Sequence, residues 1–455
     1  MASVRPAAVA GAFYPGDAHA LAADLAELLD GVETFEPKFD FPKALIVPHA
    51  GYIYSGPVAA HAYDALGPAR GIVRRVVLLG PVHRVPVRGL ALPGSDAFET
   101  PLGRVAIDRH AIRALDGLPQ VVTSPAAHQL EHSIEVQLPF LQRALGEFAL
   151  LPLAVGEATP GQVSEVIDRL WGGPETLIVV STDLSHYRSY DDARRIDAAT
   201  LARIEALGAD LDHEQACGAT PLNGLLALAR RRALSIRRLA ACNSGDTAGG
   251  RARVVGYAAL ALHERDSVTA ADAGRALLDI ARDAIGRRLD LAPREPLDAM
   301  PWLRQPGATF VTLMLDGVLR GCMGSLAAER TLGDDVAANA EAAAFRDPRF
   351  PQLTADEWPR CRTEVSLLSN AKPIRFADED DLLAQIRAGE DGLTIESGGR
   401  RGTFLPQVWE TLPDKRRFLE ELKRKAGIPP GTRIARCALS RYRVLKWKEP
   451  LEAGR

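Results

Sequence analysis

The chain has 455 residues, which is too long for one ordinary hydrophobic core and indicates two or three domains. Its hydrophobic content of 47% and charged content of 25% are ordinary for globular proteins. The net charge of -3 is small, so nucleic acid and anionic membranes are not expected partners. The first residues contain no apolar segment of the kind that predicts a secretory signal. The sequence has no run of about 18 apolar residues, so no membrane span is predicted.

Cysteine and histidine usage narrows the chemistry. The five cysteines are odd in number, widely spaced and without a C-x-x-C pair. This pattern indicates a reducing, cytoplasmic compartment in which each thiol is a core residue or a metal ligand. All ten histidines lie between His19 and His263, so imidazole chemistry is expected only in the first part of the chain.

Apolar runs alternate with helical patterns over residues 1–262. Near-continuous apolar runs are typical of strands that are covered on both faces. We predict strands at 44–47, 75–80, 148–155, 176–181, 236–242 and 254–262, and helices at 17–29, 132–145, 160–170 and 193–207. The alternation predicts an α/β domain in which helices cover one sheet.

Residues 268–455 follow a different pattern, after a polar break at Glu264–Asp266. The predicted elements are a capped helix at 269–289, strands at 310–315, 318–323 and 363–368, and a helix at 415–425. Asp316 and Gly317 separate two of these strands, and an Asp-Gly pair is a strong hairpin signal. Hairpins mixed with helices predict a smaller α+β domain.

Polar side chains follow four of the predicted strands in the first domain. These residues are His49, His83, Asp183 with His186, and Cys242. In open α/β sheets, sites form beyond the carboxyl ends of strands, so neighbouring strands would bring these groups together. Two imidazoles and a thiolate suit iron, zinc or copper rather than magnesium or calcium. We therefore predict a metal site at His49, His83 and Cys242, with Asp183 and His186 as orienting groups or an acid–base pair.

Each of these residues also has a structural interpretation. A histidine at a strand end is often a hydrogen-bonded structural residue, and a buried cysteine is usually a small hydrophobe. Recurrence at four strand ends favours the site. Glu131 and His132 open a predicted helix, and we interpret them as capping and surface residues, with a role at the pocket edge as the alternative.

Six motifs in the first domain resemble the MEMO family. They are Ala10–Pro15, Pro48–Gly56, Leu79–His83, Glu131–Glu135, Ser181–His186 and Cys242–Asp246. The fold of that family is similar to class III extradiol ring-cleaving dioxygenases of the LigB type. The resemblance implies a LigB-dioxygenase-like α/β domain with a metal pocket at His49, His83 and Cys242, beside Asp183 and His186. Ring-cleaving enzymes have a carboxylate where this chain has Cys242, so catechol cleavage is not expected.

The second domain resembles the AMMECR family. Four motifs carry this resemblance, at Leu319–Ser325, Ala344–Phe350, Glu364–Ser369 and Gly402–Val408. Bacterial and archaeal relatives of both domains are associated with a radical-SAM protein, the AmmeMemoRadiSam set, so the resemblance implies such a partner. Arg320 near Cys322 would favour a thiolate, and a packed core cysteine is the alternative.

Two functions follow from these observations. The first is a metal-dependent redox or oxygen-handling enzyme, an oxidoreductase that acts with a radical-SAM partner on an unknown small molecule or peptide. Iron is the first choice of metal, with copper or zinc as alternatives. The second is a non-catalytic metal-binding scaffold whose vestigial dioxygenase pocket recognises a peptide or another protein. An open coordination position beside an acid–base pair would favour the first function, and a pocket too closed for a substrate would favour the second.

Overall fold

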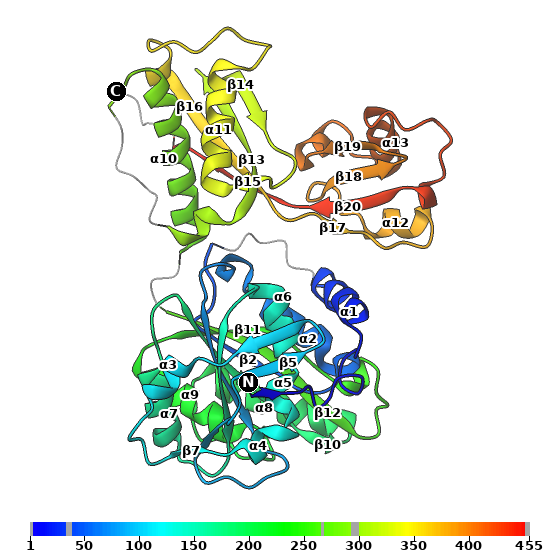
Figure 1. Ribbon diagram of the computed structural model, residues 1–455. Helices are drawn as coiled ribbons and strands as arrows, with labels where there is room; N and C mark the ends of the chain where they lie inside the picture. Colours follow the sequence, from blue (N-terminus) through cyan, green and yellow to red (C-terminus); the bar gives the residue numbers. More distant parts are fainter. Residues whose placement is uncertain (1–2, 33–38, 265–267, 293–299, 451–455) are drawn as a thin grey trace. The chain divides into compact units, whose positions relative to one another are not determined.

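The computed structural model describes residues 3–32, 39–264, 268–292 and 300–450 (Figure 1). The chain divides into two compact units, and the two-domain organisation is confirmed. The first unit contains the described residues up to Val32 and those from Asp40 to Glu264. The second unit contains Phe39 and the described residues from Val268 onward. Arg265 and Asp266 of the predicted polar break lie outside the described residues. None of the described helices is both long and apolar enough to cross a membrane.

One large sheet organises the first unit. Its strands lie in the order β10 (His186–Arg188), β12 (Val254–His263), β2 (Ala44–Val47), β9 (Thr176–Ser181), β3 (Arg75–Pro81), β8 (Ala149–Val155), β4 (Leu90–Leu92) and β7 (Val121–Thr123), with β11 (Ser235–Asn243) paired to β12. Strands β2, β9, β3 and β8 are parallel neighbours. Their carboxyl ends therefore meet at one edge of the sheet, as the strand-end argument required. All six predicted strands are present.

Helices cover both faces of this sheet. One core contains residues of α1 (Ala18–Asp30), α2 (Tyr52–Asp64) and α6 (Leu138–Leu145), and the other contains residues of α7 (Pro160–Arg169), α8 (Tyr190–Glu205) and α9 (Ala219–Arg231). Strand β2 shows why its sequence is apolar throughout: Leu45 and Val47 belong to the first core, and Ala44 and Ile46 to the second. The α/β prediction is confirmed.

Several short elements were not predicted. They are β1 (Val4–Arg5), β5 (Ala97–Thr100), β6 (Gly103–Ala106), α3 (Arg109–Arg113) and α4 (Pro125–Gln129), besides β4, β7 and β10. Elements of this length carry no readable periodicity. Helix α2 was also missed, since Pro57 inside it interrupts the helical signal.

The helix predicted at 132–145 is two helices. α5 (His132–Glu135) ends before α6 begins, and Pro139 occupies the first turn of α6, where its missing N–H costs nothing. Gln137 lies between the two helices and is buried.

The second unit consists of two antiparallel sheets with helices. The first sheet has the order β14 (Val318–Gly324), β13 (Pro306–Leu315), β16 (Cys361–Leu368) and β21 (Val444–Lys448), with β15 (Arg330–Thr331) beside β13, and packs with α10 (Ala270–Arg288) and α11 (Leu332–Phe345). The second has the order β17 (Lys372–Pro373), β20 (Ala438–Tyr442), β18 (Gly392–Ser397) and β19 (Arg400–Phe404), near α12 (Glu379–Gln385) and α13 (Lys415–Lys425). The predicted hairpin is present, and Asp316 and Gly317 both have positive φ, as its turn requires. The α+β prediction for this part of the chain holds.

Candidate metal centre

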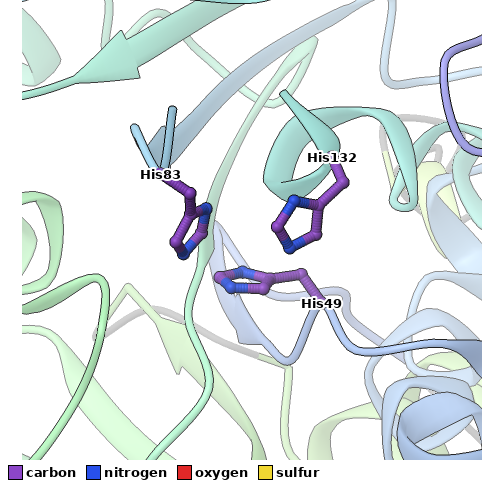
Figure 2. Close-up of side chains that lie close together, drawn as sticks. All are labelled: His49, His83 and His132. Atoms are coloured by element: carbon purple, nitrogen blue, oxygen red, sulfur yellow. The ribbon is translucent and has the colours of Figure 1, made fainter. Parts of the chain in front are cut away.

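Three imidazoles meet at the carboxyl edge of the large sheet. One ligand atom from each of His49, His83 and His132 lies within 4.8 Å of the others, and Figure 2 shows the rings turned toward one another. The ring centroids are 4.7 Å apart for His83 and His132, 5.2 Å for His49 and His83, and 5.4 Å for His49 and His132. Three histidines are a common ligand set for a catalytic zinc ion, and imidazole also suits iron and copper.

Strand order and one close backbone approach assemble this cluster. His49 follows β2 and His83 follows β3, and these strands flank β9. His132 arrives from α5, whose Ser133 donates a hydrogen bond to the Pro81 carbonyl at the end of β3. A Cβ on Gly80 would lie 2.6 Å from Ser133 Oγ, so only glycine lets α5 approach the strand this closely.

Glu131 holds two of the three histidines. Its Oε1 accepts a hydrogen bond from Nδ1 of His83 at 2.9 Å and lies 3.3 Å from Nδ1 of His132. The same carboxylate caps α5 by accepting from the backbone N–H groups of His132 and Ser133. Burial would raise the pKa of Glu131, but the hydrogen bonds, that from His83 foremost, lower the pKa to about 2. An ionised Glu131 keeps the proton of His83 on Nδ1 and leaves Nε2 for a ligand.

The protein environment keeps two of these imidazoles, those of His49 and His132, in the neutral form that metal binding requires. Burial, reinforced by His132 and His83, holds the pKa of His49 well below its usual range. Burial also lowers the pKa of His132 to about 4, although Glu131 opposes this shift. Protons therefore compete weakly for these two rings at neutral pH.

Asp183 contacts His49, and His186 is near enough to His49 and His83 for their charges to interact. Asp183 Oδ1 accepts a hydrogen bond from the backbone N–H of His49 at 2.7 Å, and its Oδ2 is 3.9 Å from His49 Nε2. Burial raises the pKa of Asp183 to about 7. His186 is half-buried, and its Nδ1 hydrogen-bonds the Leu184 carbonyl at 2.8 Å.

The structure brings a thiol that the sequence did not predict, Cys217, against His49. Cys217 Sγ is 3.3 Å from His49 Nε2 and accepts a hydrogen bond from the backbone N–H of Asp183. Burial, together with the Asp183 charge, raises the pKa of this thiol to about 12. Cys242 pairs with Tyr257 on β12, which separates β11 from β2 by two strand spacings, roughly 10 Å. The role of Cys242 as a ligand stays a prediction.

Sequence reasoning missed His132 and Cys217 for different reasons. Glu131 does cap α5, but the interpretation of His132 as a surface residue was wrong because the same helix start faces the strand ends. The pairing of His132 with Glu131 in one motif was the available signal. Cys217 precedes α9 rather than following a strand, so a search of strand ends could not find it.

The second unit offers no comparable cluster among the residues that the structure describes. The guanidinium of Arg320 donates hydrogen bonds to Glu357 and to the carbonyls of Pro351 and Gln352. It is therefore not directed at the Cys322 thiol as predicted. Gly321, between them, has its Cα against the Ala343 carbonyl, where a Cβ would lie 2.1 Å away. This motif therefore serves the packing of β14 against α11.

A buried histidine outside the cluster predicts how stability depends on pH. Burial lowers the pKa of His128 to about 4, and its Nε2 lies 2.7 Å from the Ala91 carbonyl. The unfolded chain binds this proton near pH 6.5 and the folded chain does not, so stability falls as pH drops from about 6.5 to about 4, by about 3 kcal/mol. We expect His128→Gln to show a smaller loss over that range in metal-free protein. Urea unfolding followed by circular dichroism at several pH values measures it, and equal slopes would contradict the assignment.

The fold and the cluster define a class: an α/β domain with a three-histidine candidate metal centre, joined to an α+β domain. Comparison with known proteins agrees with the two-domain organisation. The family model described as Memo-like protein matches residues 5–261, and the AMMECR1 model matches residues 278–447. The chain belongs to the Memo-like protein family and carries an AMMECR1 domain after the Memo domain.

Several known proteins are similar to the first domain. A MEMO1 family protein of Aquifex aeolicus is 37% identical over 270 residues, 56% of this chain and 97% of the relative. One from Methanopyrus kandleri is 36% identical over 290 residues, 56% of this chain and 98% of the relative. A solved structure of an uncharacterized Pyrococcus horikoshii protein is 29% identical, covers 40% of this chain and 94% of its own, and has a TM-score of 0.35.

Proposed function

We propose that the first domain binds one divalent transition metal ion between His49, His83 and His132 and uses it in redox or oxygen chemistry. The convergence of three imidazoles, with one ring nitrogen of each within 4.8 Å of the others, is the observation that carries the proposal. A nitrogen-rich set of this kind suits iron, with copper or zinc as alternatives. The bound metal would supply Lewis acidity or electron transfer to a substrate.

The thiol that completes the donor set is, in this proposal, Cys217. Its sulfur lies 3.3 Å from His49 Nε2, a separation typical of two ligands on one ion. A thiolate donates more charge than a carboxylate and selects softer metals. Catechol ring cleavage, which depends on a carboxylate ligand in the enzymes with the LigB-type fold, therefore stays outside the proposed activity.

A cavity beside the pocket supports the enzyme over the scaffold. Its volume is about 960 Å³, within the size range of small-molecule sites. The lining includes Cys217, which contacts His49, and Val82, which precedes His83. The cavity therefore reaches the proposed donor set at Cys217, and a substrate bound there would lie beside that thiol. Asp183 and His186 are the proposed acid–base groups, and the radical-SAM partner implied by the family resemblance stays a prediction.

Cobalt substitution tests the proposal and identifies the thiol. We expect the Co²⁺-loaded protein to bind one equivalent and to show the near-ultraviolet sulfur-to-cobalt charge-transfer band of a thiolate ligand. Cys217→Ser should abolish the band and weaken affinity by at least about tenfold, or about 1.4 kcal/mol. Cys242→Ser is the matched control and should keep both.

The opposite results are equally informative. Loss of the band in Cys242→Ser with retention in Cys217→Ser would restore the ligand predicted from the sequence. Absence of stoichiometric binding by the wild-type protein would remove the metal function itself. Elemental analysis of anaerobically purified protein identifies the native metal.

A further inference from the structure

We propose that Ser181 is a positioning residue that sets the tautomer of His49, with the proton on Nδ1 and the Nε2 lone pair facing the metal pocket. The inference rests on the proposed metal site and concerns how one of its ligands is prepared. His83 has the Glu131 carboxylate at Nδ1, whereas the Nδ1 of His49 faces a neutral hydroxyl, Ser181 Oγ, at 2.9 Å. A hydroxyl can donate or accept, so by itself it would leave the tautomer of His49 undecided.

The surroundings of Ser181 remove that ambiguity. Ser181 Oγ lies 2.6 Å from the Ser133 carbonyl, which can only accept, so the hydroxyl proton points there. Gln137 Nε2 donates to Ser181 Oγ at 2.8 Å. The single proton is committed and one lone pair is occupied, so the remaining lone pair accepts from His49 Nδ1.

The orientation of the Gln137 amide is fixed as well. Its Nε2 also donates to the Pro48 carbonyl at 2.9 Å, and its Oε1 accepts from the hydroxyl of Tyr63 at 2.7 Å. A flipped amide would set its oxygen against the Pro48 carbonyl oxygen. Ser181, Gln137 and Tyr63 are all buried, so water does not substitute for these partners. The break between α5 and α6 is what brings Gln137 to this position.

The groups near Nε2, on the other side of the His49 ring, would favour the opposite tautomer. His49 Nε2 has two acceptors nearby, Cys217 Sγ at 3.3 Å and Asp183 Oδ2 at 3.9 Å. Acting as an acceptor, either group would favour a proton on Nε2 and so block the ligand atom. Ser181 opposes them by accepting the proton on Nδ1.

The test reads the tautomer directly in metal-free protein. Long-range ¹H–¹⁵N spectra of histidine-labelled protein distinguish protonated from unprotonated ring nitrogens, and His49→Gln identifies the signals of His49. We expect Nδ1–H in the wild type and a shift toward Nε2–H in Ser181→Ala. Zn²⁺ affinity should fall about ten- to a hundredfold in that variant, the usual effect of losing a partner behind a metal-bound histidine. Ser164→Ala is the control, since Ser164 is equally buried and its hydroxyl has no partner among the described residues.

Ser181→Thr keeps the hydroxyl and should restore the Nδ1–H tautomer and the affinity. Nε2–H in wild-type His49 would overturn the proposal, even if Ser181→Ala failed to fold. An unchanged tautomer in a folded Ser181→Ala would do the same. Failure of the wild type to bind Zn²⁺ would instead count against the metal site, because the tautomer is measured without metal.

Discussion

Replacing His132 with alanine is expected to weaken Zn²⁺ binding by about a hundredfold, or about 2.8 kcal/mol. The physical reason is the loss of one of three converging nitrogen donors, which leaves the ion with fewer strong bonds in a site that is otherwise unchanged. Isothermal titration of the metal-free protein measures the change. His132 is the most informative of the three histidines because the sequence did not predict it as a ligand.

His128→Gln supplies the matched control for this experiment. His128 is also a buried histidine, but it bonds the Ala91 carbonyl and lies outside the cluster. We expect it to leave Zn²⁺ affinity unchanged. Equal affinities for the His132→Ala and wild-type proteins would exclude His132 from the site and leave His49 and His83 with the thiol.

Breaking the buried ion pair between Arg5 and Glu135 should cost about 3–5 kcal/mol of stability in the first unit. The side chains are 5% and 0% exposed, and their closest atoms are 2.6 Å apart. Glu135 also accepts hydrogen bonds from the backbone N–H groups of Ala8 and Val9 and from the Tyr14 hydroxyl. Arg5→Ala leaves that carboxylate buried with its counter-charge removed, which is the expensive case.

Hydrogen exchange followed by mass spectrometry measures the loss in peptides from β2, β3 and β9. Arg104→Ala serves as the control, because the Arg104–Glu99 pair is exposed and such pairs contribute about 0–1 kcal/mol. Equal protection in Arg5→Ala and Arg104→Ala would show that the buried pair does not anchor the N-terminal segment.

The parts of the fold that the sequence predicted are those with a strong local signal. β2, β3, β8 and β9 are almost entirely apolar because both faces of each are covered, so their positions could be predicted almost to the residue. The hairpin at Asp316-Gly317 was equally readable, because its turn chemistry is local.

The site was only partly predictable, because strand order is not a local property. His49 and His83 meet because β9 alone separates their strands, whereas Cys242 lies on β11, two strands away from β2. Cys217 reaches His49 from the loop before α9, and no spacing along the chain signals that contact. Gln137 likewise depends on where one helix ends and the next begins.

The carboxylate of Glu131 contacts two of the three histidines, so these two donors are not positioned independently. His83 and His132 come from a strand end and a helix start, yet both contact the same oxygen, Oε1, and the backbone of each is also bonded to Glu131. The position of the Glu131 side chain therefore orients two of the three proposed ligands. We therefore expect His83 and His132 to become ordered or disordered together, whereas His49 is oriented separately by Ser181.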